Sequence, residues 1–266
     1  MKNIPLSQIA YIILFLIIAA SFSPAYGNLS LLNTSVEDYI RMGILEYQNN
    51  NFDIALNHFQ AAENKGLSNP DLYFNIANCF YRLNNIAYSI VYYKKALLLN
   101  SAHREAKQNL DFMLSITRDK QIDLDEGFMN NLMTTAFYSL SINSLLSICL
   151  ILLMVLVLNI HIQWFFVNLD RTILRFVNFV LLFLLLGLSG LVLSRVQMVN
   201  KNNEAVVVEN TVYVYSGPNE SFTRLFSVHE GTVLRINREE ADWVQITTLS
   251  GFSGWINSNV FVRIKD

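Results

Sequence analysis

Charge is scarce in this sequence. Only 15% of its 266 residues are Asp, Glu, Lys or Arg, and the formal net charge is -2. Lys and Arg form no cluster, so the chain carries no electrostatic footprint for DNA or RNA, and neither is expected as a partner. Hydrophobic residues make up 53% of the chain, which exceeds the usual share in soluble domains. Part of the chain is therefore expected to lie in lipid.

Histidine and cysteine are also few. The histidines are His58, His103, His161 and His229. Their spacing matches neither a metal site nor an H-E-x-x-H motif, and the sequence has no G-x-x-x-x-G-K-[ST] phosphate-binding loop. Cys79 lies in an apolar helical pattern and Cys149 in a long apolar run, so we expect two buried free thiols. No nucleophile can be paired with a base, and we expect no enzyme activity, metal or cofactor.

The N-terminus has the pattern of an export signal at residues 1–27. Lys2 precedes an uncharged apolar core at 9–22, and the small residues Ala25 and Gly27 follow at a spacing compatible with cleavage. The alternative is an anchor that is not cleaved. In either case, the residues that follow are expected to be translocated.

Residues 28–115 contain an internal repeat. When 36–69 is set above 70–103, residues of similar size align with a period of 34 residues. The aligned pairs are Gly43 with Ala77, Phe52 with Ile86, Ala55 with Ser89, Phe59 with Tyr93, and Ala62 with Ala96. The stretches YIRMG and YFNIA occupy the place of the pattern W-x-x-L-G. The segment resembles two tetratricopeptide repeats followed by a capping helix.

The repeat pattern also predicts how the helices pack and turn. The small residues let paired helices approach closely, while the large ones fill the space between them. The turn within each pair is predicted at 49–51 and at 84–85, because Asn tolerates left-handed backbone geometry. Two repeats are few for independent stability, so we expect a partner or the membrane hairpin to help hold them.

The inner helix of each pair is predicted to line a concave face suited to an extended peptide or a partner helix. Its candidate protein-binding residues are Ile40, Ile44, Tyr47, Phe74, Asn78, Tyr81, Arg82, Gln108 and Phe112. In the alternative interpretation, several of these aromatic side chains pack against the next repeat or the capping helix.

Two long apolar runs predict two transmembrane helices within residues 137–195. Residues 127–169 contain no Asp, Glu, Lys or Arg, and a second uncharged run occupies 176–194. Each run is long enough to span a bilayer. Arg171 and Arg175 lie in or beside the loop between them, but the orientation depends mainly on the export signal. Two spans return the chain to its starting side, so both soluble parts are expected on the periplasmic side of a bacterial inner membrane.

The last segment, residues 204–266, is predicted to be a small all-β domain. Runs rich in β-branched and aromatic residues lie at 205–208, 212–215, 232–236 and 243–247, with Gly-containing turns between several of them. The sequences VYSGP, EGT, WVQI and GWI follow one another in this order. Together they resemble the bacterial SH3-like family, which implies binding of cell-wall peptide or of another protein.

Aromatic side chains of this domain are candidates for a binding surface. They are Tyr213, Tyr215, Phe222, Trp243, Phe252 and Trp255. A barrel of this size needs large side chains to fill its interior, so Trp243 and Trp255 are assigned to packing.

The order of the segments along the chain is informative as well. It runs from signal (1–27) to repeats (28–115), linker (116–136), two spans (137–195) and SH3-like domain (204–266). This multidomain order resembles the BatE-like proteins of bacterial aerotolerance operons. The resemblance implies partners among von Willebrand A-domain Bat membrane proteins and an indirect link to a MoxR-type ATPase. We therefore expect a membrane-anchored scaffold; the alternative is a sensor that binds peptidoglycan.

Overall fold

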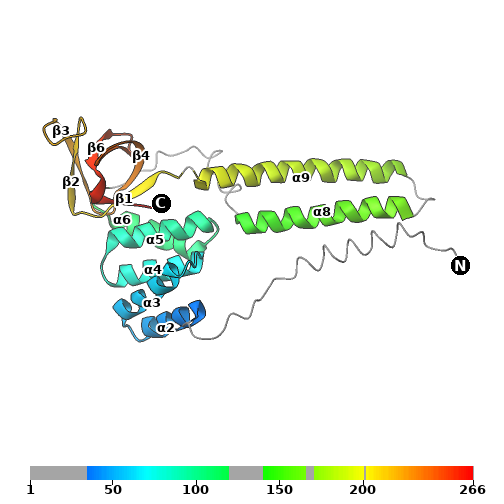
Figure 1. Cartoon of the computed structure of the whole chain (residues 1–266), viewed down its shortest axis with the longest axis horizontal. Helices are drawn as coiled ribbons and strands as arrows, with labels where there is room; N and C mark the ends of the chain where they lie inside the picture. Colours follow the sequence, from blue (N-terminus) through cyan, green and yellow to red (C-terminus); the bar gives the residue numbers. More distant parts are fainter. Residues whose placement is uncertain (1–34, 120–139, 166–170, 201, 266) are drawn as a thin grey trace. The chain divides into compact units, whose positions relative to one another are not determined.

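The computed structural model describes residues 35–119, 140–165, 171–200 and 202–265 (Figure 1). The predicted export signal at 1–27 lies outside the described residues, as does most of the predicted linker.

A helical segment opens the described chain. Its helices are α2 (Val36–Gln48), α3 (Phe52–Asn64), α4 (Pro70–Arg82), α5 (Ile86–Leu99) and α6 (Arg104–Ile116). Helices α2 and α4 begin 34 residues apart, and so do α3 and α5, which matches the period of the sequence. The turns within the pairs fall at the predicted Asn residues, because Asn50 and Asn84 adopt positive φ values of 64° and 59°.

Polar side chains fix where these helices begin. The Asn69 side chain accepts a hydrogen bond from the Asp71 backbone N–H, and Pro70 occupies the first turn of α4. Asn85 accepts from the Tyr88 N–H at the start of α5. His103 accepts from the Ala106 N–H at the start of α6. The boundaries are therefore encoded locally.

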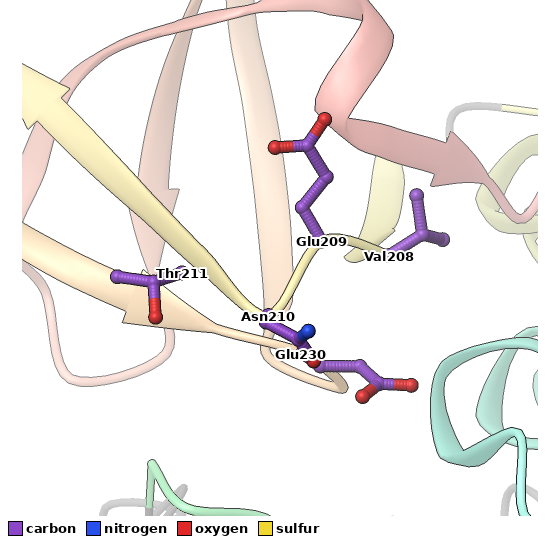
Figure 2. A pocket seen from close by; sticks show the side chains of 5 residues that line it. All are labelled: Val208, Glu209, Asn210, Thr211 and Glu230. Carbon is purple, nitrogen blue, oxygen red and sulfur yellow. The ribbon is translucent and has the colours of Figure 1, made fainter.

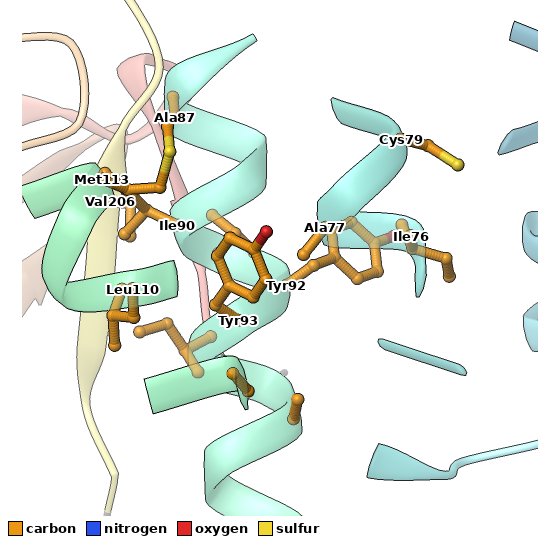
Figure 3. Close-up of a cluster of buried hydrophobic side chains, with 14 of the residues drawn as sticks. Ile76, Ala77, Cys79, Ala87, Ile90, Tyr92, Tyr93, Leu110, Met113 and Val206 are labelled. Carbon is orange, nitrogen blue, oxygen red and sulfur yellow. The ribbon is translucent and has the colours of Figure 1, made fainter. Parts of the chain in front are cut away.

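The core of the helical segment pairs large residues with small ones, as the repeat predicts. Phe59 is 1% exposed, and a Cβ atom on Gly43 would lie 2.6 Å from its ring. Only glycine at position 43 lets α2 approach the ring this closely. Figure 3 shows the continuation of the core, where Tyr93 and Ile90 of α5 lie among the buried side chains.

Two helices, α8 (Ile142–Phe165) and α9 (Arg171–Asn200), pack against each other as a hairpin (Figure 1). Both are long and apolar enough to cross a membrane. Helix α9 extends beyond the predicted limit of residue 195, and it includes Arg171 and Arg175, which the sequence placed in or beside a loop. Arg is a good helix former, so the helix continues past the ends of the apolar run.

The last segment is a β domain with a single antiparallel sheet. Its strands are β1 (Glu204–Val207), β2 (Thr211–Tyr215), β3 (Arg224–His229), β4 (Val233–Glu240), β5 (Trp243–Thr248), β6 (Ser253–Asn257) and β7 (Phe261–Arg263). A 3-10 turn, Ser258–Val260, precedes β7. The order in the sheet is β3-β2-β6-β5-β4-β1-β7. The four predicted runs correspond to β1, β2, β4 and β5.

The β domain packs on the helical segment. Val206 of β1 belongs to the same buried cluster as Ile90 of α5 (Figure 3). Val233 of β4 is part of this cluster too. At the edge of this contact, Lys94 Nζ lies 2.8 Å from Glu204 Oε2. The two modules, which the sequence presents as separate, therefore share one core.

Candidate protein-binding surfaces

Tyr81 and Phe112 form an exposed aromatic pair on the predicted inner helices. Their rings meet edge to face, with centroids 6.2 Å apart. The side chains are 43% and 50% exposed. Ile44, which is also exposed, occupies the register of Phe112 two repeat periods earlier. Exposed apolar side chains that recur on one helix face are typical of a surface that binds a partner.

Tyr47 and Arg82 meet at a different place. Both contact Phe52 at the start of α3: the Arg82 guanidinium lies 4.3 Å from the ring centroid, and the Tyr47 ring lies 5.2 Å from it. Burial raises the pKa of the Tyr47 hydroxyl, and the charge of Arg82 opposes part of this rise. These two candidates therefore stabilise the junction of the two helix pairs.

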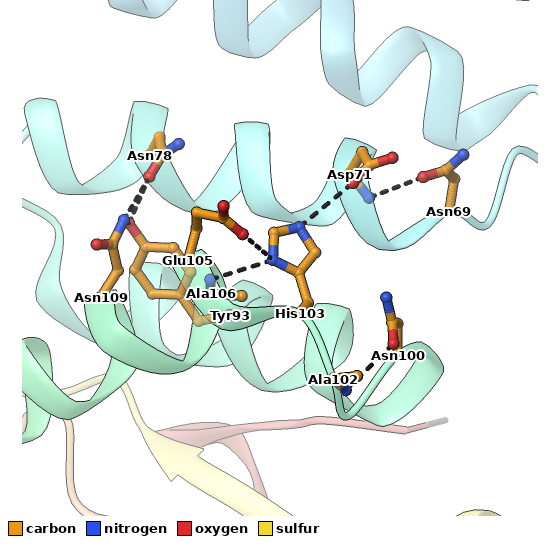
Figure 4. Close-up of polar contacts among 10 residues, drawn as sticks. All are labelled: Asn69, Asp71, Asn78, Tyr93, Asn100, Ala102, His103, Glu105, Ala106 and Asn109. Carbon is orange, nitrogen blue, oxygen red and sulfur yellow. Dashed lines mark hydrogen bonds and ion pairs between the residues drawn. The ribbon is translucent and has the colours of Figure 1, made fainter. Parts of the chain in front are cut away.

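Asn78 lies at the centre of a polar network (Figure 4). Its Oδ1 accepts from the Tyr93 hydroxyl at 2.5 Å and from Asn109 Nδ2 at 3.2 Å. Burial raises the pKa of Tyr93 to about 12, so its hydroxyl stays protonated and donates. The network ties α4, α5 and α6 together. Asn109 was not among the predicted residues, because its neighbours come from other helices.

Phe74 and the remaining candidates complete the set. The Phe74 ring lies 5.0 Å from the His103 ring, between α4 and the start of α6. Its neighbour His103 is within 3.3 Å of Asp71 and 3.4 Å of Glu105 (Figure 4). Ile40 packs against the core, whereas Gln108 is exposed. Within the described ranges, no three His, Cys, Asp or Glu side chains are arranged to hold a metal ion.

The two cysteines are both free thiols, but they differ in burial. Cys79 is buried in α4, and burial raises its pKa to about 12. Cys149 is free too, but it is only half-buried, so the expectation of burial is wrong in part.

Aromatic residues of the β domain divide into packing and surface. Trp255 and Tyr215 are buried, while Trp243 is half-buried against Tyr215 at 5.5 Å. Tyr213, Phe222 and Phe252 are exposed. Arg224 covers Tyr213, with its guanidinium 4.3 Å from the ring centroid. The exposed set is the better candidate for a ligand of this domain.

A shallow pocket opens at two turns of the β domain (Figure 2). It is lined by Val208, Glu209, Asn210, Thr211 and Glu230. The Glu230 carboxylate accepts from the Ala87 N–H at 3.4 Å, in the first turn of α5. A carboxylate is favoured at the start of a helix because it offsets the helix dipole. The pocket thus belongs to the contact between the modules.

Asp119 closes the same contact from the end of the helical segment. Its carboxylate accepts from the Thr232 hydroxyl at 2.7 Å and from the His229 N–H at 2.8 Å, and lies 2.8 Å from His229 Nδ1. Burial raises the pKa of Asp119, but these hydrogen bonds outweigh it and the net pKa is lowered. The carboxylate is therefore ionised in the contact.

The lowered pKa of Asp119 predicts acid sensitivity. A group with a lowered pKa contributes stability at neutral pH, and this stability is lost as pH falls below the ordinary value of 3.8 toward the lower folded value. We expect Asp119→Ala to weaken the contact by about 1–3 kcal/mol at pH 7, because two donors lose their acceptor. Hydrogen exchange of residues 228–232 in the full chain measures the effect.

Asp119→Asn is the matched variant for the pH dependence. It keeps an acceptor oxygen but has no titrating charge. The protection of residues 228–232 against exchange, relative to an unfolded chain at the same pH, should therefore change less between pH 6 and pH 3 (about the range of carboxylate titration) than in the parent. Equal pH profiles in parent and variant would show that ionisation of Asp119 does not stabilise the contact.

Comparison with known proteins finds a family match for one part of the chain. Residues 208–260 match the family described as bacterial SH3 domain. This confirms the SH3-like resemblance for most of the β domain, whereas the match does not extend to the helices. No curated protein matches the chain. The tetratricopeptide-repeat and BatE-like resemblances stay predictions.

Proposed function

We propose that this protein is a membrane-anchored, non-enzymatic scaffold that presents two protein-binding modules on the periplasmic side of a bacterial inner membrane. The observation that carries the proposal is the bacterial SH3 domain, which packs on helices that expose the Tyr81–Phe112 pair. Helices α8 and α9 are the anchor in this proposal.

The contact between the modules supports the hairpin topology. Residues of α5 and β1 touch, although α8 and α9 lie between them in the sequence. If both helices cross the bilayer, the chain crosses twice and the modules share one side, which this contact requires. The side itself is inferred from the apolar N-terminus, whose pattern is that of an export signal.

The helices are the stronger candidate for the main partner contact. Their repeat spacing resembles tetratricopeptide repeats. Tyr81 and Phe112 offer large rigid rings, which lose little conformational entropy when a partner binds. The BatE-like order of segments suggests von Willebrand A-domain Bat membrane proteins as the partners, in a complex that serves aerotolerance or another stress response.

The Tyr81→Ala/Phe112→Ala double variant tests this proposal. We expect it to lose most of the membrane-protein partner when the full chain is crosslinked in its own membranes and captured, because aromatic residues that act as hot spots of an interface contribute about 2 kcal/mol or more to binding. Phe222→Ala/Phe252→Ala, which removes exposed rings from the β domain, is the matched control. If the Tyr81/Phe112 variant captures as much of the membrane-protein partner as the parent chain, the proposal for the helices is contradicted.

The second candidate function is a peptidoglycan-binding sensor. It is favoured by the SH3 match together with the exposed Tyr213, Phe222 and Phe252. Purified cell wall should then retain the full chain in detergent, and Phe222→Ala/Phe252→Ala should release it while the Tyr81/Phe112 variant stays bound. Release by neither variant, or no retention of the parent chain, speaks against this function.

A further inference from the structure

Helix α2 exposes a face that its repeat equivalents bury. Met42 is 40% exposed, while Ile76 and Leu110, one and two periods later, are 0% and 7% exposed. Leu45 is 55% exposed, while its equivalents Cys79 and Met113 are 0% and 1% exposed. The difference therefore repeats at two adjacent positions of the same helix face.

The cause of the difference is a missing neighbour. Helix α3 packs on α4, and α5 packs on α6, so each later inner helix has a preceding helix against it. Among the described residues, no helix precedes α2. The face formed by Asp38, Met42, Leu45 and Asn49, here called the α2 end face, continues the packing surface that is used twice within the chain.

We propose that the α2 end face binds the same face of a second copy of this chain, with the two α2 helices antiparallel. Its residues are self-complementary about a two-fold axis between positions 43 and 44. Met42 then lies opposite the partner's Leu45. The Asp38 carboxylate, which also pairs with Arg41 of its own helix at 2.6 Å, lies opposite the amide of the partner's Asn49. A two-fold arrangement is the commonest symmetry of homo-oligomers.

The opposite end of the helical segment argues for this closed arrangement. There β1 packs on α5, and Val206, Val233 and Ile264 of the β domain belong to the same buried cluster as residues of α5 and α6. A second copy therefore cannot continue the stack by placing its own α5 against α2. Pairing of α2 with α2 uses the same end of both copies, so it stops at a dimer. Confinement to a membrane would raise the local concentration of the two copies.

Thiol crosslinking of the full chain in native membranes tests the dimer. Leu45→Cys is introduced with Cys149→Ser, and a short bismaleimide is added; Cys79 is buried and does not compete. We expect the band to shift from monomer to dimer. The matched control is Ile44→Cys, which is similarly exposed at 42% but lies on the groove face of the same helix, and we expect it to stay monomeric.

The other outcomes each contradict the proposal. Equal dimer from Leu45→Cys and Ile44→Cys indicates only random proximity in the membrane. Monomer in which a monofunctional maleimide readily labels the Leu45→Cys variant indicates an uncovered face. Monomer with a protected thiol indicates a different occupant, either another protein or residues 28–34 of the same chain. Because Tyr81 and Phe112 are not on this face, the result is independent of the proposed partner site.

Discussion

Replacing Phe59 with Ala is expected to lower the free energy of unfolding of the helical segment by about 3–5 kcal/mol. The ring is 1% exposed and lies directly against Gly43, so its removal leaves a cavity between α2 and α3. Neighbouring side chains cannot fill it easily, because the nearby residues Ala55 and Ala62 are small and buried. Hydrogen exchange of α2 and α3 in the full chain measures the loss.

The control for Phe59→Ala is Phe112→Ala. Phe112 is 50% exposed, so the same substitution leaves no cavity and should change the free energy of unfolding by about 0.5 kcal/mol or less. The two variants thus separate folding from partner binding. If Phe112→Ala opened the helices as much as Phe59→Ala, the exposed pair would be structural and its role in binding would be lost.

Replacing Gly254 with Ala is expected to destabilise the β domain by about 1–3 kcal/mol or more. A Cβ atom at this position would overlap Val214 Cγ1 and lie 2.9 Å from the Tyr215 carbonyl oxygen. Val214 is fully buried and the carbonyl belongs to the backbone of β2, so neither can move away cheaply. Urea unfolding of the full chain in detergent, followed by exchange at 204–266, measures the shift.

Gly217→Ala is the matched control for Gly254→Ala. Its Cβ atom would lie 2.6 Å from the Phe222 ring, but Phe222 is 47% exposed and its side chain can turn away. We expect a change of about 0.5 kcal/mol or less. A loss from Gly254→Ala as small as that from Gly217→Ala would mean that the β2–β6 approach tolerates a methyl group and that Gly254 is not required there.

The sequence predicts the helices well, for a local reason. Small and large residues alternate at fixed distances, and Asn50 and Asn84 end helices through their own backbone preference, so no distant contact is needed. Strand β3 gave a weaker signal. It is an edge strand next to β2, and its Leu225 is exposed, so the regular alternation of a half-buried strand is absent.

Candidate site residues were harder to assign from the sequence. Asn78 and Arg82 lie in the expected register, but their roles depend on Tyr93 and Phe52, which other helices supply. Only a structure shows that Asn78 is occupied within the chain while Tyr81 and Phe112 remain exposed. The contact between α5 and β1 could not be predicted from the sequence. The apolar residues that form it are equally compatible with a helical segment and a β domain that do not touch.

The contact between Lys94 and Glu204 joins residues 110 positions apart, with both long apolar helices inside the loop that it closes. During synthesis, α5 leaves the ribosome long before β1 exists, and its β-facing side stays uncovered in the meantime. If α8 and α9 are inserted into the bilayer, the last segment can dock only after both have been threaded through. The β domain would then dock on α5 only in chains whose two spans are both correctly inserted. A chain with one span misplaced would leave Ile90 and the rest of this core exposed to chaperones and proteases.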